Sequence, residues 1–206
     1  MTADFIIKNG TLEKYTGSEA CVTVPEGITK IGESAFSGCR SLQSVTIPEG
    51  VIELGTNAFT LCTALESVRL PSSLIGIENG VFASCFHLQC INLPEGLWYI
   101  GWNAFMDCKS LQSITLPASL TQIGGMAFEN CTRLESINFP EGLWYIGEDA
   151  FWNCPSLRSI HLPDSLCETG ETVFYGCDGL EEASVSADSP YDEMDIPTSC
   201  KIIVRD

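Results

Sequence analysis

The chain of 206 residues carries eleven cysteines, the residue type best able to form disulfides, bind a metal or act as a nucleophile. Seven of them recur at a constant interval of 23 residues: Cys39, Cys62, Cys85, Cys108, Cys131, Cys154 and Cys177. The sequence holds no C-x-x-C pair, the commonest zinc signature, and side chains stacked in parallel point poorly for a disulfide. We predict that these seven, the ladder cysteines, are reduced packing residues. The sequence leaves a disulfide as an alternative only for the pair Cys167 and Cys200.

Histidines and carboxylates offer little further chemistry. Neither His87 nor His161 has a serine or cysteine and an acid at a spacing that predicts contact. Glu95 and Glu141 would lie about 10 Å apart across two stacked repeats, at the far edge of inverting-glycosidase geometry. Each stands between a proline and a glycine, as tight turns prefer, and no D-x-D-x-D run indicates calcium. We therefore predict no enzyme activity, no catalytic residue, no metal site and no cofactor.

A repeat of 23 residues must position these side chains. Prolines from Pro25 to Pro163 and phenylalanines from Phe36 to Phe174 recur seven times at the interval of the ladder cysteines. Seven repeats therefore cover residues 22–182, with an N-terminal cap at 1–21 and a C-terminal cap at 183–206. The units have to stack, because no single unit can bury its apolar side alone. The whole chain, 1–206, is thus predicted to be one domain.

The local pattern changes along each repeat, as in VTIPEGVIELGTNAFTLCTALES. Val45–Ile47 alternates apolar and polar residues, which predicts a short strand. Apolar spacing over 58–62 fits one helical or 3-10 turn. Phe59 and its equivalents predict a continuous internal spine of aromatic rings. In the third repeat Glu78 replaces the turn glycine and Gly80 follows, which predicts a turn displaced by two residues.

The pattern LxxVxIPxxVxxLGxxAFxxCxx resembles the BspA-type leucine-rich repeat of bacterial surface proteins. The resemblance implies a right-handed, mainly β repeat solenoid with short helical or 3-10 turns, whose strands line the inner face of an open, curved body. It also implies an N-terminal hairpin in FIIKNGTLEKYTG, where Asn9-Gly10 is a turn signal. Members of this family act in adhesion and binding, and the resemblance implies no enzymatic activity for the repeat itself.

Charge restricts the partners. Ten basic and 27 acidic residues give a net charge of −17, which repels phosphate backbones and anionic membranes, so we predict no nucleic-acid partner. No run of 18 apolar residues predicts membrane insertion. The resemblance implies a cell-surface or secreted location. The start of the sequence lacks the pattern of a secretory signal, and many free thiols suit a reducing setting, so a cytoplasmic location stays open.

Two ladders of outward positions are the candidate binding residues. The first is polar and lies at the outward strand position, where it includes Arg69, Asn92, Asn138 and His161 beside threonines. The second is apolar where the pattern predicts exposure: Ile52, Ile75, Trp98, Thr121, Trp144 and Cys167, with Tyr99 and Tyr145 one place further on. Aromatic side chains dominate the energetics of many interfaces, so we expect the second ladder to bind a partner.

Three interpretations of the apolar ladder stay open. Trp98, Tyr99, Trp144 and Tyr145 would anchor a protein or glycan ligand, would cover neighbouring coils within their own chain, or would pair two copies as a homodimer. We predict that both indoles are at least partly exposed, whereas Trp102 faces Gly125 and has room to lie over it. The predicted function is a non-enzymatic binding or adhesion module; the alternative is a structural spacer or self-assembling scaffold array of a bacterial surface protein.

Overall fold

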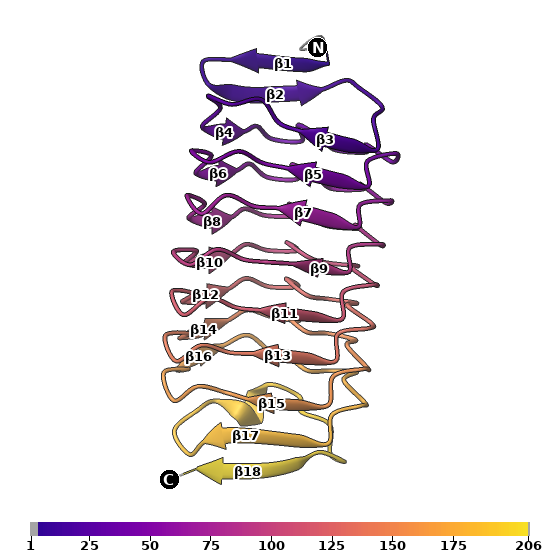
Figure 1. Ribbon diagram of the computed structural model, residues 1–206. Helices are drawn as coiled ribbons and strands as arrows, with labels where there is room; N and C mark the ends of the chain where they lie inside the picture. Colours follow the sequence, from indigo (N-terminus) through magenta and orange to yellow (C-terminus); the bar gives the residue numbers. More distant parts are fainter. Residues whose placement is uncertain (1–3, 206) are drawn as a thin grey trace.

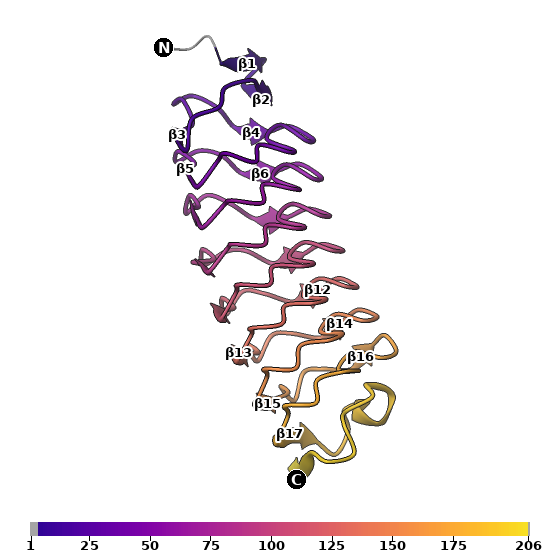
Figure 2. The same cartoon turned by 90° about the vertical axis from the view of Figure 1, so that its right-hand side faces the viewer.

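The computed structural model describes residues 4–205 and shows a stack of coils, each contributing one strand to each of two columns (Figures 1 and 2). One column is a nine-stranded sheet: β1 (Phe5–Lys8), β2 (Thr11–Tyr15), β4 (Lys30–Ile31), β6 (Glu53–Leu54), β8 (Gly76–Ile77), β10 (Tyr99–Ile100), β12 (Gln122–Ile123), β14 (Tyr145–Ile146) and β16 (Glu168–Thr169). We call it the short-strand sheet. All its neighbours pair in parallel except β1 with β2, which are antiparallel.

The second column consists of a four-stranded and a five-stranded sheet, which a single parallel bridge between Asn92 and Thr115 connects. Its strands are β3 (Cys21–Thr23), β5 (Ser44–Thr46), β7 (Ser67–Arg69), β9 (Cys90–Ile91), β11 (Ser113–Thr115), β13 (Ser136–Asn138), β15 (Ser159–His161), β17 (Glu182–Ser186) and β18 (Lys201–Arg205). The repeat solenoid predicted from the 23-residue interval is therefore confirmed.

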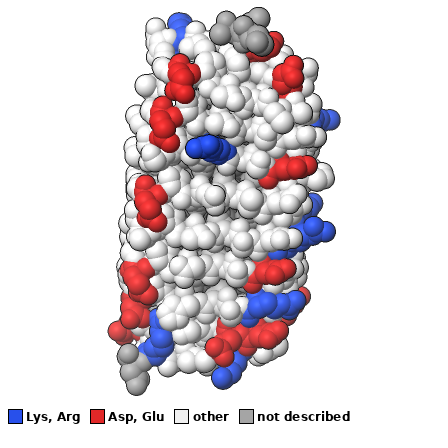
Figure 3. Space-filling model, viewed as in Figure 1, with Lys and Arg blue, Asp and Glu red and all other residues white. Residues whose placement is uncertain are grey.

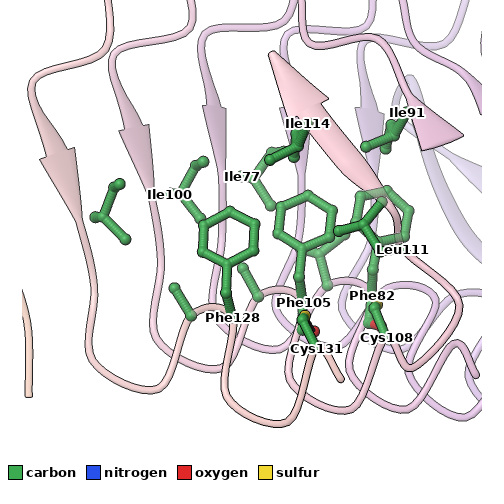
Figure 4. Packing of buried hydrophobic residues seen from close by; sticks show 14 of the residues in the cluster. Ile77, Phe82, Ile91, Ile100, Phe105, Cys108, Leu111, Ile114, Phe128 and Cys131 are labelled. Carbon is green, nitrogen blue, oxygen red and sulfur yellow. Dashed lines mark hydrogen bonds between the residues drawn. The ribbon is translucent and has the colours of Figure 1, made fainter. Parts of the chain in front are cut away.

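The core is a column of rings between the two strand columns. All seven repeat phenylalanines are fully buried, and each stacks on the next with ring centroids 4.8–5.5 Å apart. Figure 4 shows Phe82, Phe105 and Phe128 in this spine, with Cys108 and Cys131 beneath the rings. Because each buried phenylalanine contributes about 1.5–3 kcal/mol, the predicted spine is a major part of the stabilising free energy.

The structure differs from the helical or 3-10 turn expected at 58–62. This segment makes isolated turns, such as Ala58 N–H to Gly55 O at 3.0 Å and Cys62 N–H to Phe59 O at 3.1 Å. Asn57 and Leu61 have left-handed φ angles of 58° and 60°, and such residues interrupt a right-handed helix. Among the described residues the one helical element is the 3-10 turn η1 (Tyr191–Glu193), which lies in the C-terminal cap.

The predicted displacement of the turn at Glu78 is wrong. Gly80, with φ 65°, occupies the left-handed position that Asn57 and Asn103 hold one repeat away on either side. Ile77 pairs with Leu54 in the usual register. Pairing with a coil on both sides holds the register, so Glu78 sits in the glycine position itself and its side chain must find room between the coils.

The two caps close the core differently. The predicted N-terminal hairpin is confirmed: β1 and β2 join through Asn9 and Gly10, both with positive φ, and Tyr15 extends the ring stack onto Phe36 at 5.1 Å. At the other end Met194 is fully buried and its carbonyl accepts the N–H of Phe174 at 2.8 Å. Within residues 4–205, no helix is both long and apolar enough to cross a membrane.

Candidate binding surface

An exposed apolar ridge runs along one corner of the solenoid. We define the aromatic stripe as Ile52, Ile75, Trp98 and Trp144 with the adjoining Tyr99 and Tyr145. Each of the first four stands immediately before a short strand, namely β6, β8, β10 and β14 respectively. From Ile52 to Trp144 the stripe crosses four coil intervals, or about 19 Å at the usual strand spacing.

The backbone holds these side chains outside. Trp98 donates its N–H to Ile75 O at 3.1 Å and accepts the N–H of Thr121 at 2.9 Å, and Trp144 donates to Thr121 O at 3.0 Å. The neighbours Leu97 and Ile100 already fill the interior. The exposed fractions are therefore 48% for Ile52, 51% for Ile75, 45% for Trp98 and 37% for Trp144, which confirms that both indoles are partly exposed.

Tyr99 reaches back across the preceding coil. Its ring lies over Gly76, in the space that a side chain on that residue would fill, and its hydroxyl donates to the carboxylate of Glu78. Burial, with a smaller contribution from the charge of Glu53, raises the pKa of Glu78 above its ordinary value. Trp98 packs against Tyr99 with ring centroids 4.5 Å apart, so the two rings form one aromatic unit.

Two hollows flank Tyr99. The first, of about 190 Å³, lies between β6, β8 and β10 and is lined by Ile52, Glu53, Ile75, Gly76, Glu78, Trp98 and Tyr99. The second, of about 160 Å³, lies towards β12 and β14, and Trp102, Gln122 and Tyr145 contribute to its walls. Sequence reasoning missed the first as a site. Its available signals were Gly76 among larger residues at equivalent positions and Glu78 in place of a glycine.

Two other tryptophans have intramolecular roles. Trp102 lies over Gly125 as expected, since a Cβ added to that glycine would meet the indole at 2.7 Å. Trp152 stacks on Tyr175 with centroids 6.3 Å apart and planes 10° from parallel. The covering role predicted as one alternative applies to Tyr99, whose ring lies over Gly76, whereas Trp98 and Trp144 stay exposed. Trp102 covers Gly125 and is itself 45% exposed.

The polar ladder lies on the other column of strands. Arg69, Asn92 and Asn138 are exposed there, on or beside β7, β9 and β13. His161 on β15 is also exposed, but Arg205 of β18 contacts its ring and pairs with Asp164 at 2.6 Å. Figure 3 shows the charged side chains of this face mainly along its two long margins. Two of the hollows in the described part of the chain, by contrast, lie along the aromatic stripe.

The ladder cysteines lie inside the solenoid. Six of the seven are fully buried, and Cys39 is partly buried. Each buried Sγ lies 3.1–3.3 Å from the carbonyl oxygen of the spine phenylalanine in the preceding coil, so the thiol donates a hydrogen bond there. Burial raises the pKa of Cys62 to about 12. A neutral, buried donor of this kind is a poor nucleophile.

The remaining candidate chemistry is sparse. Cys167 is exposed and Cys200 is buried, and both are free thiols. Within the part of the chain that the structure describes, no three His, Cys, Asp or Glu side chains gather closely enough to hold a metal ion. The Nδ1 atom of His87 lies 2.6 Å from Thr63 O, so its nearest polar partner is a backbone carbonyl.

Comparisons with known proteins agree with this geometry. A family model described as "BspA type Leucine rich repeat region (6 copies)" matches residues 7–134 and 99–202. A leucine-rich repeat protein of T. pallidum is 31% identical, and the match covers 87% of this chain and 89% of that one with a TM-score of 0.83. No curated protein sequence matches the chain at a significant level.

More distant solved structures are also leucine-rich repeat proteins. One from Bacteroides ovatus is 19% identical over 98% of this chain and 97% of that one, with a TM-score of 0.44. A leucine-rich cell surface protein from Faecalibacterium prausnitzii is 20% identical over 97% and 92%, with a TM-score of 0.42.

Proposed function

The chain belongs to the BspA-type leucine-rich repeat family, and on that premise we propose that it is a binding or adhesion module without enzymatic activity. Proteins built on this repeat are generally scaffolds rather than enzymes. We propose that a protein or glycan partner binds on the aromatic stripe, and that the protein works at the cell surface or after secretion. The net charge of −17 argues against nucleic acid as the partner.

The single observation that carries the proposal is the exposure of the stripe. Its members are large apolar side chains, and the same repeat position holds Thr29 and Thr121 in other coils, so the repeat itself does not require an apolar residue there. The coils of Ile52, Ile75 and Trp98 follow one another, and an exposed apolar patch of this kind usually marks an interface. Exposed rings offer flat faces that stack on apolar protein side chains or on the apolar face of a sugar.

The test is a screen for ligands by thermal shift. Wild-type protein is melted with a panel of soluble polysaccharides and extracellular matrix proteins. A partner at about one hundred times its Kd adds about 2.7 kcal/mol to the free energy of unfolding, which corresponds to about 5–10 °C for a chain of this length. The double variant Trp98→Ser/Trp144→Ser should lose this shift and keep its own melting temperature within a few degrees, because both indoles are exposed.

The matched control is Arg69→Ser/Asn138→Ser, which changes two exposed residues of the polar ladder and should keep the shift. Sedimentation of the wild type and of the tryptophan variant separates the homodimer and spacer interpretations. A loss of self-association in the tryptophan variant would indicate that the stripe pairs two copies of the chain. No hit in the panel, together with monomers for wild type and variant, would favour the spacer function instead.

A further inference from the structure

The first hollow of the stripe has the dimensions of a socket for one side chain. Its volume of about 190 Å³ is below the range of about 300–1,000 Å³ that pockets for whole small ligands occupy. The ring of Tyr99 occupies the space above Gly76, and the hollow lies beside this ring, where Ile52, Ile75 and Trp98 also line it. A single long side chain that enters here would contact an indole face and aliphatic carbons.

The polar wall of this hollow is acidic. Glu53 and Glu78 both line it. Lys30 pairs with Glu53 at 2.5 Å, whereas Glu78 receives a hydrogen bond from the neutral hydroxyl of Tyr99. The ion pairs of residues 4–205 include none to Glu78. Two carboxylates thus share one cation, and the hollow keeps an unbalanced negative charge beside an aromatic ring.

We propose that this hollow binds an arginine side chain of a protein partner. The proposal rests on the function proposed above and names its ligand class. A guanidinium group stacks on an indole through a cation–π contact and donates to carboxylates in the same plane, which an ammonium group does less well. A sugar hydroxyl would leave the negative charge uncompensated.

Charge complementarity also favours a basic partner over a second copy of the chain. With 10 basic against 27 acidic residues, two copies repel each other, and the field of the protein attracts a basic segment. The second hollow lies two coils further along the stripe, about 10 Å away, and the residues that line it include no carboxylate. A peptide in the polyproline II conformation rises about 3.1 Å per residue and has three residues per turn, so side chains three residues apart lie on the same side, about 9 Å apart. The stripe therefore fits an arginine followed, three residues later, by an apolar side chain.

The probe is an acetylated peptide amide of sequence Ala-Arg-Ala-Ala-Leu-Ala, with a second peptide in which citrulline replaces arginine. Citrulline keeps the shape of the side chain and removes its charge. Titration calorimetry with the full chain should show binding of the arginine peptide at least tenfold tighter than of the citrulline peptide. The variant Glu53→Gln/Glu78→Gln should abolish that difference and keep the fold, because glutamine still accepts the hydrogen bond from Tyr99.

The control is Glu66→Gln/Glu135→Gln, which removes the same number of charges at exposed sites next to β7 and β13. It should keep the preference for arginine; an equal loss in this variant would assign the effect to overall charge and overturn the proposal. Equal binding of both peptides, lost in Trp98→Ser/Trp144→Ser, would overturn the arginine site and leave the binding function standing. No binding of either peptide up to about 1 mM would also overturn it.

Discussion

Raising the pH should unfold this protein through its buried thiols. The four thiols of Cys62, Cys85, Cys108 and Cys131 are fully buried and donate to spine carbonyls. Burial raises the pKa of Cys62 from its ordinary 9.0 to about 12, and those of the other three well above 9.0. In the unfolded chain the same thiols meet water and ionise near their ordinary pKa.

The sign follows from proton binding. Between pH 9 and about 12 the unfolded chain releases these protons while the folded chain keeps them, so the stability that the neutral thiols provide is complete below pH 9 and falls as the pH rises. At about pH 10 each unfolded thiol is about 90% ionised, which favours unfolding by about 1.4 kcal/mol. Four thiols give a loss of about 5–6 kcal/mol between pH 8 and pH 10, comparable with the whole stability of many domains.

Thermal melts by circular dichroism under reducing conditions, from about pH 7 to pH 10, measure this loss. At about 2–4 °C for each kcal/mol, the melting temperature should fall by about 10–20 °C. Lysine and tyrosine residues also titrate in this range, so the variant Cys131→Ala isolates one thiol. Between pH 8 and pH 10 the free energy of unfolding of this variant should fall by about 1.4 kcal/mol less than that of the wild type. Its melting temperature should accordingly fall by about 3–5 °C less.

The control for this variant is Cys90→Ala, which removes an exposed thiol on β9. This control keeps every buried thiol, so its melting temperature should fall with rising pH in parallel with that of the wild type. Parallel curves for Cys131→Ala and the wild type would refute the reasoning, because the thiol would then ionise equally in the folded and unfolded states.

Three further changes test the architecture. Phe105→Ala should cost about 3–5 kcal/mol and broaden the melting transition, because the ring is fully buried between two neighbours; an unmoved transition would contradict the spine. Gly124→Ala should lower the melting temperature, since its Cβ would lie 2.7 Å from the backbone nitrogen of the preceding coil, whereas Gly142→Ala, with 3.5 Å to its nearest atom, should not. Arg205→Gln removes contacts to Asp164 and to the carbonyl of residue 162, so hydrogen exchange should quicken about tenfold in β18 and stay unchanged in β13.

The fold could be predicted because the interval of 23 residues leaves almost no freedom. Once Phe59 is assigned to the interior, every equivalent phenylalanine must follow it, and the structure places all of them in one stack. The exposure of Trp98 and Trp144 follows from the same reasoning, since the inward positions of each coil are already occupied. The hairpin at Asn9 and Gly10 was predictable for a different reason, namely that these two residue types favour positive φ.

Other features depend on contacts between coils that a single sequence does not display. The thiol of Cys62 donates to Phe36, which is 26 residues earlier: one full coil plus three residues. The pattern shows the three-residue separation within a repeat but not the direction in which Sγ points. Likewise, the error at Glu78 arose because a glycine two residues later suggested a moved turn, whereas strand pairing on both sides fixes the register.

The candidate site depends on departures from the repeat. In the interior, identical residues produce a regular stack, with the rings of neighbouring coils 4.8–5.5 Å apart. Along the short-strand sheet the position of Tyr99 instead alternates in size, with Gly76 before it, Gln122 after it and Tyr145 next. Because the coil spacing is fixed, a large side chain can reach over a glycine in the preceding coil, as the ring of Tyr99 does over Gly76, and the two hollows lie beside that ring. The repeat therefore supplies the rigid support, and the coils that differ from it shape the surface that we propose as the binding site.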